Sequence, residues 1–263
     1  PDLVAYPNNG VLRQNRSQFD PANPTQGGVN GVTGFLDLSP LYGSTAAALD
    51  IVRDRASQRG KLLMVNGYSP WNDTTRLFKL GGQFARSQNI FTLAINTVFL
   101  REHNRLCDWL YTIYNTTWND EQYFQEARRW NIGQYQKIVS EEYLGVVTGR
   151  PLPPYTAYNP NEKPGTDVFF NAIALRYGHS EISDSYNILN INGETLAELP
   201  LSQTVRLDLL LRVGLAPILR SMASQRQEEV DAYVSDETRA WTGVNKLKYE
   251  VAAFDVSRGR DLG

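Results

Sequence analysis

The sequence predicts a mainly α-helical protein with short β elements only. Apolar residues recur at helical spacing over two long segments, residues 87–113 and 120–144. The segments that join the helical stretches are rich in proline, glycine and asparagine, and alternating stretches are brief. The 263 residues, 41% of them hydrophobic, are enough to bury a sizeable core. Since the chain opens on PDLVAYPNNG and stops at RGRDLG, in mid-pattern, we expect residues 1–263 to form a single partial domain, truncated at both ends.

Composition and charge exclude several classes of partner. The formal net charge is −2 and the pI is near 5.8, so no basic stripe for nucleic acid is present. The only cysteine, Cys107, excludes an internal disulfide framework and a CxxC metal site. No apolar run approaches the length of a membrane span, so we expect no transmembrane segment in this chain.

The first 30 residues have no regular period, and a candidate ligand loop follows them at residues 30–44. Here Thr33, Phe35, Asp37 and Ser39 occupy every second position of the chain. In an extended chain their side chains point the same way and offer a carboxylate and two hydroxyls, with backbone carbonyls adding more oxygen. The pattern suits part of a calcium loop, and it equally suits a strand before a turn.

Short elements are expected next. Residues 44–57 predict a helix with Ser44 or Thr45 as its N-cap, and residues 60–67 predict a brief strand. Residues 67–83 have the composition of a loop.

Residues 87–113 predict the strongest helix of the chain. It is apolar on two adjacent stripes and should therefore lie in the core. His103 lies on the second stripe among polar neighbours, which favours a buried hydrogen-bond network over a metal ligand.

A second long helix is expected over residues 120–144. Asn119 and Gln122 form a capping-box pattern at its start, and Gly149 with the RPLPPY run ends it. Residues 150–164 then predict a loop, and Asn192-Gly193 predicts a tight turn. Residues 201–219 and 238–253 have further helical spacing, which Pro217 interrupts.

The second histidine, His179, ends an apolar helical run over residues 165–182. Thr166 or Asp167 would cap its start, and Gly178 lets the backbone approach a neighbour closely. Two interpretations are open: a core histidine satisfied by a neighbour, or an imidazole that a flat group approaches. At α-helical spacing one face carries Val168, Ala172, Leu175 and His179.

Five motifs in order resemble the animal-type haem peroxidase superfamily, which includes myeloperoxidase, peroxidasin, the dual oxidase peroxidase domain and the cyclooxygenases. They are LDLSPLYGS, FLREHNRLCDWL, WNDEQYFQEAR, LRYGHSEI and SRGRDLG. The resemblance implies a largely helical fold that holds haem b, with His179 as the proximal iron ligand. It also implies that Arg176, Asp255 and Arg258 are cofactor-binding residues. The family usually has asparagine at the Asp255 position, where it accepts a hydrogen bond from the proximal imidazole.

The resemblance also implies calcium. The family's TxFxDxS loop corresponds to Thr33, Phe35 through its carbonyl, Asp37 and Ser39. Calcium needs at least about six oxygens, and the family takes a further ligand from an upstream segment. The family's distal histidine also lies upstream, so we expect it before Pro1.

The distal arginine of the family has no direct equivalent. Counting back along the chain from Arg101 without a gap places Ala85 where many family members have this arginine. If the alignment is shifted by one residue, Arg86 takes that position and the catalytic role. The one-residue shift matters because the side chains of adjacent residues on a helix point about 100° apart. The alternative for Arg86 is therefore a solvated surface arginine.

The resemblance predicts an oxidoreductase that uses hydrogen peroxide to oxidise halide or small organic donors. One alternative is a fatty-acid dioxygenase of the cyclooxygenase kind that acts on lipid, although Arg176 stands where those enzymes have tyrosine. The other is a non-catalytic peroxidase-homology module. Glycosylation sequons at Asn15, Asn72 and Asn115 suit a secreted or extracellular-facing protein.

Overall fold

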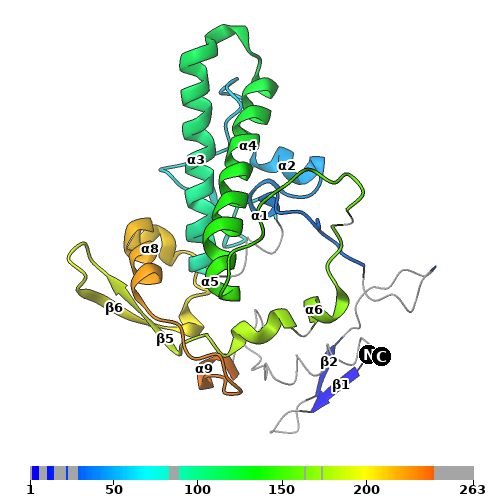
Figure 1. Cartoon of the computed structure of the whole chain (residues 1–263). Coiled ribbons are helices and arrows are strands. Elements are labelled where there is room, and N and C mark those ends of the chain that lie inside the picture. Colours follow the sequence, from blue (N-terminus) through cyan, green and yellow to red (C-terminus); the bar gives the residue numbers. More distant parts are fainter. Residues whose placement is uncertain are drawn as a thin grey trace. The chain divides into compact units, whose positions relative to one another are not determined.

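The computed structural model describes residues 2–5, 11–14, 22, 29–82, 89–162, 164–172 and 174–239 (Figure 1). The chain divides into two compact units, each assembled from separate stretches. The first comprises Pro1–Gly34, Pro164–Thr204 and Arg220–Gly263, and the second comprises Phe35–Lys163 and Val205–Leu219. The longest described elements are helices and the sheets are two-stranded, which confirms the mainly α prediction. A single domain over residues 1–263 stays a prediction.

The second unit is built on a helical hairpin. Its helices α3 and α4 run side by side in Figure 1. Around the hairpin lie short helices and one small antiparallel sheet. The elements are α1 (Ser39–Tyr42), α2 (Ala46–Val52), β3 (Trp71–Asn72), β4 (Leu77–Phe78), α3 (Ile90–Tyr114), η2 (Asn115–Thr117), α4 (Asp120–Lys137), the π-helix η3 (Ile138–Tyr143), α5 (Leu144–Thr148) and α7 (Leu209–Val213).

Side-chain caps fix where these helices begin. Thr45 accepts a hydrogen bond from the backbone N–H of Ala48, as predicted for α2. Asn119 and Gln122 form the predicted capping box of α4. Each cap satisfies N–H groups that have no partner within the helix. The predicted helix over residues 44–57 nevertheless ends early, at Val52.

The two predicted stripes of α3 differ in burial. Asn96, Phe99, His103 and Leu110 of one stripe lie in the core; of the other stripe, Ile95, Val98 and Trp109 are exposed and Leu106 is buried. The core side of α3 packs against α4, where Tyr123 and Ala127 contact Leu106 and Leu110.

A hydrogen-bond network around His103 joins α1, α3 and α4. The Gly60 carbonyl can only accept, so the Nε2 of His103 donates to it over 3.0 Å. The Nδ1 then accepts from the Tyr42 hydroxyl at 2.9 Å. The Tyr42 oxygen in turn accepts from the Nδ2 of Asn131 at 2.9 Å, and Asn131 also donates to the Phe99 carbonyl. This confirms a structural role for His103.

Gly60 makes this network possible. Its φ is +73°, and a Cβ there would lie 2.3 Å from the backbone nitrogen of Phe124 in α4. Only glycine allows this conformation and this approach without strain.

Two short elements differ from the predictions. The stretch 60–67 forms isolated bridges rather than a strand, because the Asn104 side chain binds both the N–H and the C=O of Leu62. The helical run after residue 201 breaks at Gly214, whose φ is +89°, and not at Pro217. Pro217 lies in the first turn of α8 (Leu215–Ser224), where its missing N–H costs nothing.

The first unit contains shorter elements. The antiparallel pair β5 and β6 turns at Gly193 (φ +83°), which confirms the predicted tight turn. No described helix is long and apolar enough to cross a membrane. The elements are β1 (Asp2–Ala5), β2 (Val11–Gln14), α6 (Val168–Ala172), η4 (Ala174–His179), β5 (Ser185–Leu189), β6 (Thr195–Pro200), η5 (Leu201–Gln203) and α9 (Asp236–Arg239).

Stability should fall between pH 6.5 and pH 4.5 because of His103. Burial lowers the pKa of His103 to about 4, with Arg53 and Arg128 adding to the effect. The unfolded chain therefore binds this proton below pH 6.5, and acid favours the unfolded state by about 2 kcal/mol over the interval. Denaturant titrations at several pH values measure the slope.

The His103→Gln variant is the control for that slope. Glutamine can donate and accept but does not titrate, so the loss between pH 6.5 and pH 4.5 should disappear. Hydrogen bonds from arginine hold the pKa of Glu102 and of Glu126 below the usual range, so these carboxylates protonate at lower pH. Equal slopes in the parent and the variant would show that His103 is not the group responsible.

Candidate functional site

His179 ends the 3₁₀-helix η4, directly after α6. Asp167 caps α6: its Oδ1 accepts from the Phe170 N–H at 3.0 Å and its carbonyl from Asn171 at 2.9 Å. The predicted cap at Thr166 or Asp167 is thus confirmed at Asp167. Beyond η4, the N–H groups of Ser180 and Glu181 bond to the third residue before them, which continues the tight turn.

The 3₁₀ geometry changes which residues share a face with His179. A 3₁₀-helix has 3.0 residues per turn, so residues three apart eclipse. Arg176 therefore lies on the His179 face, and the prediction of Leu175 on that face was wrong. Leu175 is 47% exposed, whereas Arg176 and His179 are half-buried.

The two short helices that lead to His179 expose aromatic side chains. Phe169, Phe170 and Tyr177 come from the same two short helices and are all exposed, Phe169 to 60%. The two short helices that lead to His179 therefore carry exposed aromatic side chains as well as a half-buried imidazole. Gly178 lies close to the side chain of Glu181, since a Cβ at this position would be 3.1 Å from a carboxylate oxygen of Glu181.

The other histidine, His103, does not suit a metal. Both of its ring nitrogens take part in hydrogen bonds, Nδ1 with Tyr42 and Nε2 with Gly60. Among the described residues no group of three or more His, Cys, Asp or Glu side chains is arranged to hold a metal ion.

Residues 33–38 form bends and irregular backbone rather than the extended strand that the alternation suggested. Leu38 has φ +54°, and Ser39 is the first residue of α1. The Oδ1 of Asp37 accepts from the Ser39 N–H at 3.0 Å, which leaves Oδ2 for another partner. Thr33, in the first unit, is half-buried, and Phe35 has an exposed side chain. The donors remain the hard oxygens that calcium prefers, in an incomplete set.

Similarity to known proteins identifies the family. Residues 3–263 match the family described as animal haem peroxidase. The chain belongs to the animal haem peroxidase family. It is 27% identical to peroxinectin A of Dictyostelium discoideum over 253 residues, which are 89% of this chain and 47% of that protein. It is 29% identical to thyroid peroxidase of Rattus norvegicus over 276 residues, 92% of this chain and 30% of that protein.

Solved structures share the fold of this haem peroxidase family member. Peroxidase A from Dictyostelium discoideum matches with a TM-score of 0.76 at 27% identity, over 87% of this chain and 48% of that one. A fatty acid alpha-dioxygenase of Arabidopsis thaliana matches with a TM-score of 0.68 at 18% identity, over 86% and 42%, which shows the fold alone. The chain spans less than half the length of these relatives.

Three predicted site residues of this haem peroxidase family member lie outside the described residues. Arg86 falls within residues 83–88, and Asp255 and Arg258 fall within residues 240–263. Their roles stay predictions, as do the iron ligand and the calcium loop.

Proposed function

We propose that this chain is part of a haem peroxidase that uses hydrogen peroxide to oxidise halide or small organic donors, with His179 as the iron ligand of haem b. The observation that carries the proposal is the half-buried imidazole at the end of η4, in a segment whose two short helices, α6 and η4, also expose aromatic side chains. Membership of the animal haem peroxidase family supports it.

The residues around His179 suit a haem. A neutral imidazole is a good iron ligand, and the bound haem supplies the redox chemistry that peroxide cleavage needs. Arg176 lies on the same face of η4, where its planar guanidinium suits a haem carboxylate. Arg86 is the proposed distal cation, which would stabilise charge that develops as the peroxide bond breaks. Arg258 is a further proposed cofactor-binding residue.

Neither alternative function gains a specific observation. The likeness to fatty acid alpha-dioxygenases concerns the fold alone. Arg176, three residues before His179, has no phenol that could form the tyrosyl radical of the cyclooxygenase kind. A non-catalytic module would not require His179.

Two exposed sequons support a secreted or extracellular-facing protein. Asn72 in β3 and Asn115 after α3 are both solvent-exposed, as glycan addition requires.

In the full-length protein His179→Gly should abolish the Soret band or shift it strongly, because the iron loses its protein ligand. Added imidazole should restore the band by occupying the vacated space. Leu175→Ala is the matched control, since Leu175 lies off the His179 face and should keep the parent spectrum. A His179→Gly protein with an unchanged Soret band would refute the iron-ligand proposal.

Asp37→Asn should remove a calcium-dependent rise in Tm, because calcium that binds only the folded state stabilises it and a neutral amide binds calcium more weakly. Differential scanning calorimetry of the full-length protein with calcium and with chelator measures the rise. Asp54→Asn is the control, since its Oδ1 also accepts a backbone N–H two residues on, from Ala56 at 3.2 Å. An equal calcium response in parent and Asp37→Asn would exclude Asp37 as a ligand.

Asp255→Asn should raise the ferric/ferrous reduction potential of the full-length protein. We propose that the Asp255 carboxylate accepts a hydrogen bond from the His179 imidazole, where an amide would accept more weakly. The stronger acceptor increases electron density on the ligand and favours ferric iron. Spectroelectrochemical titration measures the potential. An unchanged potential with haem still bound would mean that Asp255 pairs elsewhere, for example with Arg258.

A further inference from the structure

A cavity of about 540 Å³ lies in the second unit, on the helical hairpin. This volume is within the range of small-molecule sites. Its apolar side chains come from three elements: Val98 and Phe99 from α3, Ile138 from η3 and Leu215 from α8. The polar side chains that line it are Arg101, Glu102, Arg105 and Gln134.

The apolar part of the lining is only partly covered by the chain. Phe99 and Leu215 are buried, whereas Val98 and Ile138 are exposed although they line the same cavity. An apolar group placed against these side chains would remove their surface from water, which is favourable. The cavity therefore favours an occupant with an apolar body.

Two of the charged side chains compensate each other. The Nε and the Nη2 of Arg105 each donate to the Glu102 carboxylate at 2.7 Å. The Nε2 of Gln134 donates to the same carboxylate at 3.0 Å. The hydrogen bonds from Arg105 hold the pKa of Glu102 below its usual range, so both groups stay ionised at neutral pH. This pair therefore adds no net charge to the lining.

Arg101 is the remaining cation of the lining. Its Nε donates to the Gly67 carbonyl at 2.7 Å, and its guanidinium lies 5.1 Å from the centroid of the Tyr68 ring. The Tyr68 hydroxyl in turn accepts from the Leu215 N–H at 3.1 Å. Within the described part of the chain no carboxylate pairs with Arg101, and its two terminal nitrogens have no acceptor. The guanidinium is thus positioned by two contacts and can still donate hydrogen bonds to a ligand.

We propose that this cavity binds a small organic monocarboxylate with a compact apolar body. The body would cover Val98 and Ile138, and the carboxylate would accept hydrogen bonds from the terminal nitrogens of Arg101. Two arginines and one glutamate give the lining a net charge of +1, which complements one carboxylate and disfavours a cation. The lining residues all belong to the second unit and His179 to the first, so the site does not depend on the proposed peroxidase function.

Isothermal titration calorimetry of the full-length protein with naphthoate and with its neutral analogue naphthamide tests the proposal. The two compounds share an apolar body and differ in charge, so naphthoate should bind about fivefold more tightly, as expected for one exposed ion pair. Added salt should reduce this preference by screening the charges.

Arg101→Gln should weaken the binding of naphthoate about fivefold and that of naphthamide less than twofold, because only the carboxylate loses a charged partner. Arg129→Gln is the matched control. Arg129 is also an exposed arginine of the hairpin, but it does not line the cavity. This variant should change neither affinity more than twofold.

Val98→Ser should weaken the binding of both compounds about fivefold, because each loses apolar contact. Ile95→Ser is its control, since Ile95 is exposed one turn earlier on α3 and does not line the cavity. Circular dichroism confirms that each variant is folded. The proposal fails if naphthoate does not bind, as when another segment of the full-length protein covers the cavity. It also fails if naphthamide binds as tightly, or if a cavity variant has no larger effect than its control.

Discussion

The second unit depends on one buried set of hydrogen bonds, in which Asn131 donates to Tyr42, Tyr42 to His103 and His103 to Gly60. These four residues come from α4, α1, α3 and the loop before α3, so the set links three helices and that loop by directional hydrogen bonds. Asn131 also donates to the Phe99 carbonyl, and of the two protonation states of His103 only the neutral imidazole both donates to Gly60 and accepts from Tyr42. Replacing a member by a residue that cannot make its hydrogen bonds leaves a buried polar atom without a partner, which costs about 1–3 kcal/mol.

A second polar contact orients the start of α4. The Arg53 guanidinium, 1% exposed, pairs with Asp120 at 2.7 Å and Glu121 at 3.0 Å, and stacks 3.7 Å from the Phe124 ring. Both carboxylates lie in the first turn of α4, where the helix dipole favours negative charge. The buried charge is thereby compensated on two sides, and the long hairpin is tied to the segment after α2.

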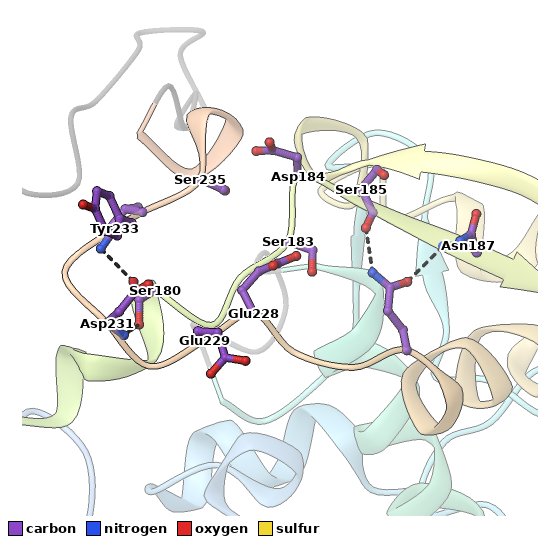
Figure 2. A pocket seen from close by; sticks show the side chains of 12 residues that line it. Ser180, Ser183, Asp184, Ser185, Asn187, Glu228, Glu229, Asp231, Tyr233 and Ser235 are labelled. Carbon is purple, nitrogen blue, oxygen red and sulfur yellow. Dashed lines mark hydrogen bonds between the residues drawn. The ribbon is translucent and has the colours of Figure 1, made fainter.

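The sequence was sufficient where a local signal decides the structure, as in the Asn119–Gln122 capping box and the Asp167 cap. It was insufficient where a distant group supplies hydrogen bonds. The Asn104 amide takes the bonds of Leu62 that a strand partner would have taken. The α-helical spacing assumed for residues 165–182 does not continue to His179, because α6 has only five residues and the 3₁₀-helix η4 follows it. The 3₁₀ geometry therefore places Leu175 off the His179 face. The hydrogen bonds between residues 180–187 and 225–235 could not be predicted, because these two segments meet only in the fold (Figure 2).

The two histidines show why residue type alone does not assign a metal ligand. His103 lies in the long helix α3 and is fully buried, yet both of its ring nitrogens form hydrogen bonds and burial lowers its pKa to about 4. Binding iron there would break a bond on which the hairpin depends. His179 is half-buried at the end of a short 3₁₀-helix, and the two short helices that lead to it expose aromatic side chains. In this chain the hairpin uses its histidine for structure, and the histidine of the other unit is the proposed iron ligand.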